Sequence, residues 1–470
     1  MADEKRKIKI DRIMIAAPAS GSGKTIFTCG LLSLLKEQGR DPVSFKCGPD
    51  YIDPMFHRDV LGIEGDNLDP FFSDGEKLRS MIASAGHKTA VLEGAMGIYD
   101  GIAGRLYESS CYDVACSTGT PIVLLVNAKG MGSTVLSAIK GILHDDKEML
   151  IKGIVLNRIS EHFYKTLSPL AQDMLDTISR ERGAECRLLG GIPDSGNVTL
   201  GTRHLGLVMP DEYGDLESKI STFREMIRSH VDIEALYRIM GNAEPLAHGY
   251  DRAPAYTGEI LKIAVARDEA FSFYYKENMN ELRRHGIEPV YFSPIHDSAI
   301  PEGVSALMLR GGYPELYAKQ LSENISMKES IRSAVESGMP SIAECGGFMY
   351  LLDSLSTDDG TTYPMTGLIK GGCRNTGRLG RFGYITVTGK EDEKNLLSGI
   401  SIKAHEFHYF DSDNNGNGAV AVKPGSGRSW ECMHTGRDHI WGYPHLYYPS
   451  CPELVARFRK AMEGYLKNDS

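Results

Sequence analysis

The sequence predicts an α/β protein of two domains, each built around a largely parallel sheet. Short β-rich runs alternate with helical stretches in the first half of the chain, and the alternation restarts after a polar interruption. Strands that alternate with helices are typical of parallel, doubly wound sheets. The length of 470 residues agrees with two or three domains, because a single hydrophobic core rarely extends beyond about 300 residues.

The first half contains five predicted buried strands, at residues 10–16, 43–46, 89–93, 121–126 and 153–156. The crossover helices between them are predicted at residues 31–38, 131–143 and 163–182. A polar stretch with Pro and Gly, residues 241–258, then breaks the periodicity. We therefore expect a first domain at residues 1–242, a linker at 243–260 and a second domain at 261–470.

The second half repeats the pattern. Residues 261–266, 306–309 and 341–344 are predicted strands, and residues 279–284 and 330–337 are predicted to lie within helices. From residue 366 onward Gly and strand-forming residues dominate, as in an antiparallel or mixed edge region.

The composition excludes some classes of protein. A formal charge of −10 argues against nucleic acid as the main partner, because binding phosphates requires a basic surface. No run approaches 18 apolar residues and no secretory leader is recognisable, so we expect no membrane association. The 9 cysteines lack the spacing of a disulfide framework, which predicts reduced thiols in a cytoplasm.

A phosphate-binding loop is predicted near the start of the chain, where a strand meets a helix. It comprises Ser20, Gly21, Ser22, Gly23, Lys24 and Thr25. Small residues allow backbone N–H groups to surround phosphate, and the helix N-terminus adds partial positive charge. Lys24 would reach the β and γ phosphates of ATP, and Thr25 would bind Mg²⁺. Pro18 stands where the usual pattern has Gly, and a turn without ligand is the alternative.

Two further strand ends carry candidate ligands for the same site. Glu93 ends a predicted strand beside the expected switch point of the sheet, where its carboxylate would hold Mg²⁺. Lys46, Asp50, Tyr51 and Asp53 follow another strand, and they suit a metal, a phosphate or an acidic substrate. A helix cap at Glu93 and ordinary turn chemistry at Asp50 are the alternatives.

Cys345 lies on a predicted strand-to-helix turn with small residues before and after it. A nucleophile elbow needs such neighbours, because the sharp turn leaves no room for side chains. We expect the helix N-terminus to lower the pKa of the thiol. Gly311 and Gly312 follow another strand and are natural oxyanion donors. A buried structural cysteine is the alternative.

The thiol requires a base, and the sequence offers two candidates. His445 lies in an aromatic segment near the end of the second domain, where a structural role is equally plausible. The rival is the segment His405-Glu406-Phe407-His408. Its alternation predicts a strand with His405 and Phe407 on one face and Glu406 and His408 on the other.

Taken together, these motifs resemble one known family. They are the phosphate loop with Pro18 and the segments 46–54, 93–101, 156–158 (Leu-Asn-Arg), 203–207 (Arg-His-Leu-Gly-Leu), 310–315, 343–347 and 405–409. Their types and order are similar to those of the glutamine-dependent cobyrinate a,c-diamide synthases of corrinoid biosynthesis. The resemblance implies an N-terminal domain similar to dethiobiotin synthetase and a C-terminal, flavodoxin-like class I glutamine amidotransferase domain of the triad type.

The resemblance also implies a reaction. ATP and Mg²⁺ would serve to phosphorylate the c and then the a carboxylate of a corrin, and ammonia from glutamine would displace the phosphate. Cys345 is similar to the nucleophile of the family and His445 to the histidine that activates it. Asn157 resembles the asparagine that reads adenine in related synthetases, with a turn as the alternative.

The chain departs from the family pattern near His445. Triad amidotransferases usually place Glu two residues after the histidine, but Tyr447 stands there, which leaves Glu406 as a candidate for the third member. The alternatives are sibling amidases acting on hydrogenobyrinate or Ni-sirohydrochlorin, a ParA-like regulatory ATPase with an inactive amidotransferase domain, and a protein that only binds tetrapyrrole. The sequence leaves open the central metal, the order of amidation, the ammonia route and whether the chain forms a homo-oligomer.

Overall fold

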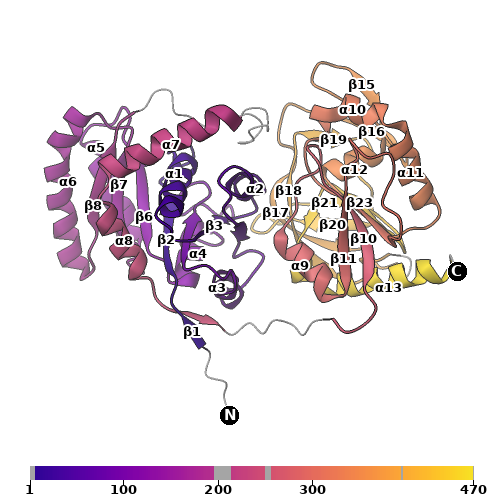
Figure 1. Ribbon diagram of the computed structural model, residues 1–470, viewed down its shortest axis with the longest axis horizontal. Helices are drawn as coiled ribbons and strands as arrows, with labels where there is room; N and C mark the ends of the chain where they lie inside the picture. The colour runs from indigo at the N-terminus through magenta and orange to yellow at the C-terminus, as the bar shows by residue number, and fades with distance from the viewer. Residues whose placement is uncertain (1–5, 195–212, 249–255, 393–394, 469–470) are drawn as a thin grey trace, which may run out of the picture. The chain divides into compact units, whose positions relative to one another are not determined.

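The computed structural model describes residues 6–194, 213–248, 256–392 and 395–468. The segment 203–207, which contributed to the family resemblance, lies outside the described residues. The chain forms two compact units, Met1–Tyr250 and Asp251–Ser470 (Figure 1). Their boundary lies within the predicted linker. The first part of that linker is a short strand, because β9 (Leu246–His248) pairs antiparallel with β1 (Arg6–Ile8).

The first unit contains a seven-stranded sheet whose order is β4-β3-β5-β2-β6-β7-β8, and every pairing in it is parallel. Its strands are β2 (Asp11–Ala16), β3 (Pro42–Cys47), β4 (Gly65–Leu68), β5 (Thr89–Glu93), β6 (Ile122–Asn127), β7 (Ile151–Asn157) and β8 (Arg187–Ile192). The five strands expected from the sequence are β2, β3, β5, β6 and β7. The doubly wound parallel sheet is confirmed.

Helices cover both faces of this sheet (Figure 1). Ile13 and Ile15 of β2 pack in a core with α1 (Lys24–Glu37), α7 (Tyr213–His230) and α8 (Ile233–Gly241). Met14 and Ala16 belong to the opposite core, with α3 (Gly75–Ser84), α4 (Cys111–Thr118), α5 (Thr134–Asp145) and α6 (Glu161–Arg182). Burial on both faces explains why these strands are continuously apolar rather than alternating.

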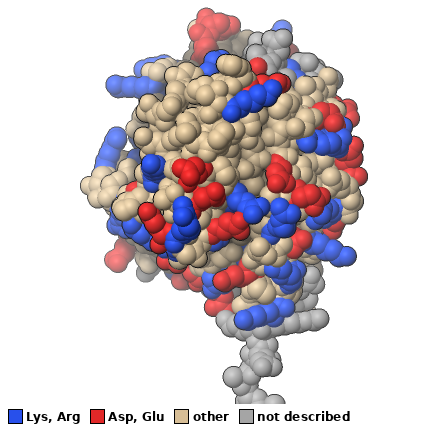
Figure 2. Space-filling view, turned by 90° about the vertical axis from the view of Figure 1, so that its left-hand side faces the viewer, with Lys and Arg blue, Asp and Glu red and all other residues tan. Residues whose placement is uncertain are grey.

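Figure 2 shows one face of the first unit, on the side where α5 and α6 lie in Figure 1. Acidic and basic side chains are interspersed over this face. Such a mixed distribution differs from the single-sign stripe by which a surface attracts a polyanion.

The second unit contains a six-stranded sheet of order β11-β10-β12-β13-β23-β22. The strands are β10 (Leu261–Ala266), β11 (Ile287–Phe292), β12 (Ala306–Leu309), β13 (Ser341–Glu344), β22 (His434–Thr435) and β23 (His439–Gly442). Strands β11, β10, β12, β13 and β23 are parallel to one another, and β22 is antiparallel to β23. The three strands expected in this half of the chain are β10, β12 and β13.

Different layers cover the two faces of this second sheet. One core contains α9 (Lys276–Arg284), α13 (Pro452–Asn468) and residues of an antiparallel sheet of order β21-β20-β17-β18-β24. That sheet is formed by β17 (Phe382–Gly389), β18 (Ser401–Phe407), β20 (Ala419–Val422), β21 (Ser429–Cys432) and β24 (His445–Leu446). The other core contains α10 (Ala318–Glu323), α11 (Ile325–Glu336) and α12 (Gly346–Leu351).

A smaller mixed sheet, β15-β14-β16-β19, completes the unit. It consists of β14 (Leu352–Ser356), β15 (Thr362–Pro364), β16 (Ile369–Asn375) and β19 (Phe410–Ser412). The antiparallel and mixed region expected after residue 366 is therefore present. Among the described residues, no helix combines the length and apolar character needed to span a bilayer.

Candidate active sites

The phosphate loop connects β2 to α1, as the sequence predicted. Gly21 and Gly23 both adopt left-handed backbone conformations, with φ of 74° and 94°, which other residues adopt at a cost. A Cβ on Gly23 would lie 2.5 Å from the side-chain amide nitrogen of Asn157. This amide, at the end of β7, donates a hydrogen bond to Ser22 O at 2.9 Å. The buried side chain of Asn157 therefore stabilises the phosphate loop.

The ammonium group of Lys24 donates hydrogen bonds to backbone carbonyls. Its Nζ donates to Met96 O at 2.6 Å and to Ala19 O at 3.3 Å. Met96 lies in the segment that follows β5. In the same segment Ile98 N donates a backbone hydrogen bond to Ala17 O, just before the phosphate loop. Burial lowers the pKa of Lys24, and the charge of Lys46 acts in the same direction. The site therefore contains a cation that an anionic ligand would stabilise.

Buried charged side chains from β3 and β5 gather next to the loop. Glu93 and Lys46 are directly opposite each other in the β3–β5 pairing, and Lys46 Nζ lies 2.8 Å from Glu93 Oε1. The same Nζ lies 2.5 Å from Asp53 Oδ2. Burial alone would lower the pKa of Lys46, but the surrounding carboxylates outweigh it and raise this pKa well above its ordinary value. Lys46 is therefore a permanent cation between two carboxylates.

The donors present fit a Mg²⁺ ion. Thr25 Oγ1 donates to Glu93 Oε1 at 2.7 Å, so two of the three predicted metal ligands are neighbours, the third being Asp50. The other carboxylate oxygen, Glu93 Oε2, is buried and has no hydrogen-bond partner among the described residues. No group of three His, Cys, Asp or Glu side chains suited to a metal occurs in the part of the chain that the structure describes. The protein would thus supply few ligands, and phosphate and water the remainder, as is usual for Mg²⁺.

Asp50 has a local structural role in this arrangement. Its Oδ1 accepts hydrogen bonds from Ile52 N and Asp53 N at 2.8 and 3.1 Å, which starts α2 (Ile52–Asp59). Burial raises the pKa of Asp50 to about 6. Tyr51 is buried in the same turn. Asp53, in the first turn of α2, forms an ion pair with Lys46.

Cys345 occupies the sharp turn between β13 and α12 in the second unit. Its φ of 50° and ψ of −108° are unusual for a residue with a side chain. The glycine turn after β12 touches this elbow: a Cβ on Gly347 would lie 2.1 Å from Leu309 O, and one on Gly346 would lie 3.1 Å from Gly312 N. The elbow therefore requires glycine on its helix side, and strain of this kind is typical of functional sites.

The predicted lowering of the thiol pKa is wrong. Burial raises the pKa of Cys345, and the carboxyl groups of Glu315, Glu406 and Glu344, where ionised, add to this effect. The Gly346 amide acts in the predicted direction but is outweighed. The helix that begins there, α12, has only 6 residues, so its dipole is small. The resting thiol is therefore protonated, and a base must remove its proton.

His445 lies against the glycine turn beside this elbow. A Cβ on Gly311 would lie 2.3 Å from Cε1 of His445, which places the imidazole in contact with the Gly311 backbone. β24, which carries His445, pairs with β18, and His445 is opposite His405 there. Burial lowers the pKa of His445 well below its ordinary value, and His405, Arg310 and His408 contribute. The imidazole is thus neutral, as a base for the thiol must be.

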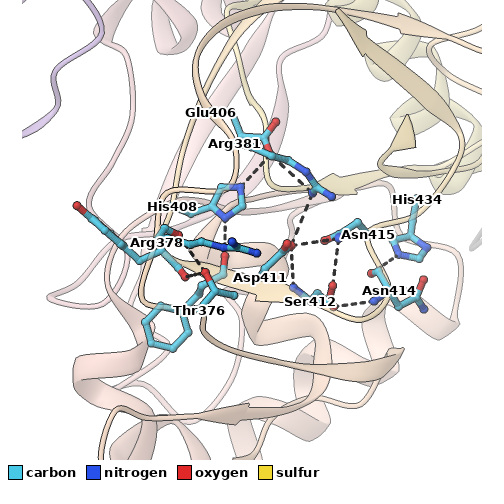
Figure 3. A network of polar contacts seen from close by, with 12 residues as sticks. Thr376, Arg378, Arg381, Glu406, His408, Asp411, Ser412, Asn414, Asn415 and His434 are labelled. Carbon is cyan, nitrogen blue, oxygen red and sulfur yellow. Dashed lines mark hydrogen bonds and ion pairs between the residues drawn. The ribbon is translucent and has the colours of Figure 1, made fainter. Parts of the chain in front are cut away.

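Two residues of the rival segment 405–408, Glu406 and His408, belong to a polar network that Figure 3 shows in close-up. His408 Nε2 lies 2.8 Å from Glu406 Oε1, and His408 Nδ1 faces Phe410 O. Arg381 lies between Glu406 and Asp411, with nitrogen–oxygen distances of 3.9 and 3.7 Å. His405 and Phe407 stack on the other face of β18, as the alternation predicted. Glu406 is therefore engaged with His408 and Arg381.

Both halves of the chain match known domain models. Residues 13–207 match the CobQ/CobB/MinD/ParA nucleotide binding domain, and residues 262–448 match the CobB/CobQ-like glutamine amidotransferase domain. Cobyrinate a,c-diamide synthase of Priestia megaterium is 34% identical over 454 residues, which cover 94% of this chain and 95% of that protein. The enzymes of the same name from Listeria innocua and Clostridium tetani are 36% and 34% identical, over 85% and 93% of this chain and 87% and 96% of theirs. The chain belongs to the cobyrinate a,c-diamide synthase family.

Membership of the cobyrinate a,c-diamide synthase family confirms the resemblance inferred from the motifs. The likeness to these relatives extends over 85–94% of this chain and therefore over both units.

Two residues at the sites had no role in the sequence interpretation. Glu344 and Arg310 are both buried within the quoted motifs, directly before Cys345 and Gly311. The signal was a charged residue at the end of an apolar strand, where a buried charge requires a partner. The partners could not be named, because Arg310 and Glu344 pair with each other across 34 residues of chain and His445 lies 101 residues after Glu344.

Proposed function

We propose that this chain amidates the c and then the a carboxylate of cobyrinate, using ATP, Mg²⁺ and ammonia derived from glutamine, in cobalamin biosynthesis. One observation carries the proposal: a chain of this family has both a phosphate loop with a buried Lys24–Thr25–Glu93 cluster and a strained cysteine elbow next to a neutral histidine. One site suits phosphoryl transfer, and the other suits release of ammonia.

In the first unit the loop amides and Lys24 would bind the phosphates of ATP. Among the described residues, Lys24 Nζ donates hydrogen bonds to two backbone carbonyl oxygens, which the negatively charged phosphates would replace. Thr25 and Glu93 would hold Mg²⁺, which offsets phosphate charge during transfer. Lys46 fixes the position of Glu93 and, with Asp53 and Tyr51, lines the side on which we place the acidic substrate. We assign Asn157 to support of the loop and, as in related synthetases, to adenine recognition.

Phosphorylation is necessary because a carboxylate is a poor acyl donor. Transfer of the γ-phosphoryl group to a carboxylate oxygen forms an acyl phosphate. Ammonia then attacks the carbonyl carbon, the C–O bond to phosphate breaks, and inorganic phosphate leaves. The amide nitrogen loses its extra proton to solvent or to the departing phosphate. Each amidation therefore consumes one ATP and one ammonia.

In the second unit the thiol of Cys345 would transfer its proton to His445 and attack the amide carbon of glutamine. The Gly312 amide, beside the elbow, would stabilise the oxyanion together with the Gly311 backbone. The proton on His445 then passes to the leaving nitrogen, and ammonia departs from a thioester. Water hydrolyses the thioester to glutamate and restores the thiol.

Glu315 suits recognition of glutamine in this site. Burial raises the pKa of Glu315 to about 8, and when ionised this group raises the pKa of the Cys345 thiol. A carboxylate in such a place would gain a partner in the α-ammonium group of glutamine. All 9 cysteines are free thiols, which supports a reducing compartment, and we place the reaction in the cytoplasm.

Mass spectrometry of the products from several tetrapyrroles tests the substrate. Cobyrinate, hydrogenobyrinate and Ni-sirohydrochlorin would each be incubated with the protein, ATP, Mg²⁺ and glutamine. We expect the a,c-diamide from cobyrinate. A diamide formed only from one of the other two would reassign the protein to a sibling amidase, and no amidated product from any of them would overturn the proposal.

A further inference from the structure

The position that usually supplies the third member of the triad, two residues after His445, is occupied by Tyr447. We infer that Glu344, the residue directly before the nucleophile, is the carboxylate that orients His445. This inference rests on the proposed function. Glu344 Oε2 lies 3.9 Å from His445 Nδ1, and both side chains are buried, at 0% and 2% exposure.

The second oxygen of Glu344 holds the segment that carries His445. Glu344 Oε1 accepts hydrogen bonds from Leu446 N at 3.4 Å and from Tyr448 Oη at 3.1 Å. One carboxylate thus contacts the imidazole, the next peptide group and a nearby side chain. Because Glu344 is bonded covalently to Cys345, it couples the position of the base to the position of the nucleophile.

Arg310 supplies the counter-charge that this buried carboxylate needs. Its Nη2 lies 3.5 Å from Glu344 Oε2, and its side chain is 1% exposed. Burial raises the pKa of Glu344 above its ordinary value, and the charge of Arg310 and the hydrogen bonds from Tyr448 and Leu446 offset only part of this rise. Arg310 immediately precedes Gly311, on which the His445 ring lies. The carboxylate of Glu344, the guanidinium of Arg310 and the imidazole of His445 therefore form one buried cluster.

This arrangement selects the useful tautomer of His445. A carboxylate facing Nδ1 favours the proton on that nitrogen, which leaves the lone pair of Nε2 to accept the thiol proton. Apo distances at catalytic sites are often long and shorten when substrate binds, so 3.9 Å is compatible with this role. Glu406, the earlier candidate, hydrogen bonds to His408 instead (Figure 3).

Two variants separate a charge role from a packing role. Glu344→Gln keeps the length and an acceptor oxygen but removes the charge, whereas Glu344→Asp keeps the charge and shortens the side chain. If Glu344 orients His445, Glu344→Gln should lower glutamine hydrolysis more than Glu344→Asp does. If Glu344 only fills space, Glu344→Asp should be the more damaging substitution. For Glu344→Gln we expect a loss of about 10²–10³-fold in kcat for glutamine hydrolysis, less than the about 10⁴-fold effect of neutralising the orienting aspartate of a serine protease.

The readouts are kcat and KM for glutamine hydrolysis, and the amidation rate with ammonium chloride in place of glutamine. We expect KM for glutamine to change less than about threefold and ammonia-driven amidation to persist, because the loss lies in proton transfer. Glutamine hydrolysis at the wild-type rate in Glu344→Gln, or a smaller loss in Gln than in Asp, would overturn the inference. A larger loss in Glu406→Gln than in Glu344→Gln would likewise overturn it and make Glu406 the orienting residue.

A further variant keeps the test decisive if Glu344→Gln fails to fold, since it leaves Arg310 buried without a counter-charge. Glu344→Gln combined with Arg310→Met removes both charges together, and it should show a loss in kcat of the same order relative to the wild type. Failure of the proposed function would look different: wild-type protein would then show no glutamine-dependent amidation, whichever residue stands at position 344.

Discussion

Substitution of Gly311 by alanine isolates the contact between the glycine turn and the base. The atoms closest to an added Cβ all belong to His445: Cε1 at 2.3 Å, Nδ1 at 3.2 Å and Nε2 at 3.3 Å. Gly311 has no left-handed φ, so alanine introduces no backbone strain there. Ordinary contact begins at 3.4 Å, so the imidazole must move by about 1.1 Å or the turn must shift by a similar amount.

A displacement of about 1 Å in a reacting group costs about 10²-fold in rate. We therefore expect Gly311→Ala to lower glutamine hydrolysis about 10²-fold, with about 1–3 kcal/mol lost from the free energy of unfolding through overpacking. Amidation driven by ammonium chloride should remain. Gly464→Ala is the matched control, because nothing lies within 4 Å of its added Cβ. Wild-type glutamine hydrolysis in Gly311→Ala would refute the placement of His445 over the turn.

Four other predictions follow from the two sites. Cys345→Ala should abolish glutamine-dependent amidation and leave the ammonia-dependent reaction largely intact; equal loss with both donors would contradict separate roles. Lys24→Ala should cripple product formation with either donor, and unchanged ammonia-driven activity would exclude it from phosphate binding. Glu315→Gln should raise KM for glutamine by about tenfold more than it changes kcat; an unchanged KM would remove Glu315 from glutamine binding. Burial lowers the pKa of His405 to about 3, so the stability it contributes is lost as the pH falls below 6.5. Between pH 7.5 and 5.5 the free energy of unfolding should fall by about 1.4 kcal/mol more than in His405→Phe, and equal pH slopes in denaturant titrations would contradict this.

The sequence predicted the parallel architecture because buried strands in α/β sheets are continuously apolar. β4 and β8 were missed for a physical reason. β4 reads Gly-Asp-Asn-Leu and has a single buried residue, while β8 carries two adjacent glycines, so neither has the apolar run of a central strand. Pairing with β3 and β7 defines these strands, and pairing is not visible in a short polar segment.

The candidate sites were predictable where a strand end and its loop are contiguous in sequence. This holds for the phosphate loop, for Glu93 after β5 and for the turn at Cys345. The orientation of His445 was not predictable, because β24 is positioned by pairing with β18 and β13 by pairing with β23. Only the folded chain brings Glu344 next to His445.

The pKa of the Cys345 thiol was predicted in the wrong direction for a related reason. A helix N-terminus is a local feature and lowers the pKa of a cysteine, whereas burial and three carboxylates act through space and raise it. Because the thiol is protonated, the attack on glutamine that we propose for Cys345 needs a base, which is the role we propose for His445. Protonation also keeps Cys345 less reactive until a substrate amide lies beside it, since the thiolate is the nucleophilic form.

Transfer of labelled nitrogen from glutamine to the corrin tests most directly that the two sites act together. Cobyrinate would be incubated with the protein, ATP, Mg²⁺ and glutamine labelled with ¹⁵N in the side-chain amide, without added ammonium. We predict a product carrying two ¹⁵N amides, with two ATP hydrolysed for each diamide formed. A product whose amides lack ¹⁵N, or amidation that proceeds without ATP, would contradict the coupling of glutamine hydrolysis at Cys345 to carboxylate activation at Lys24.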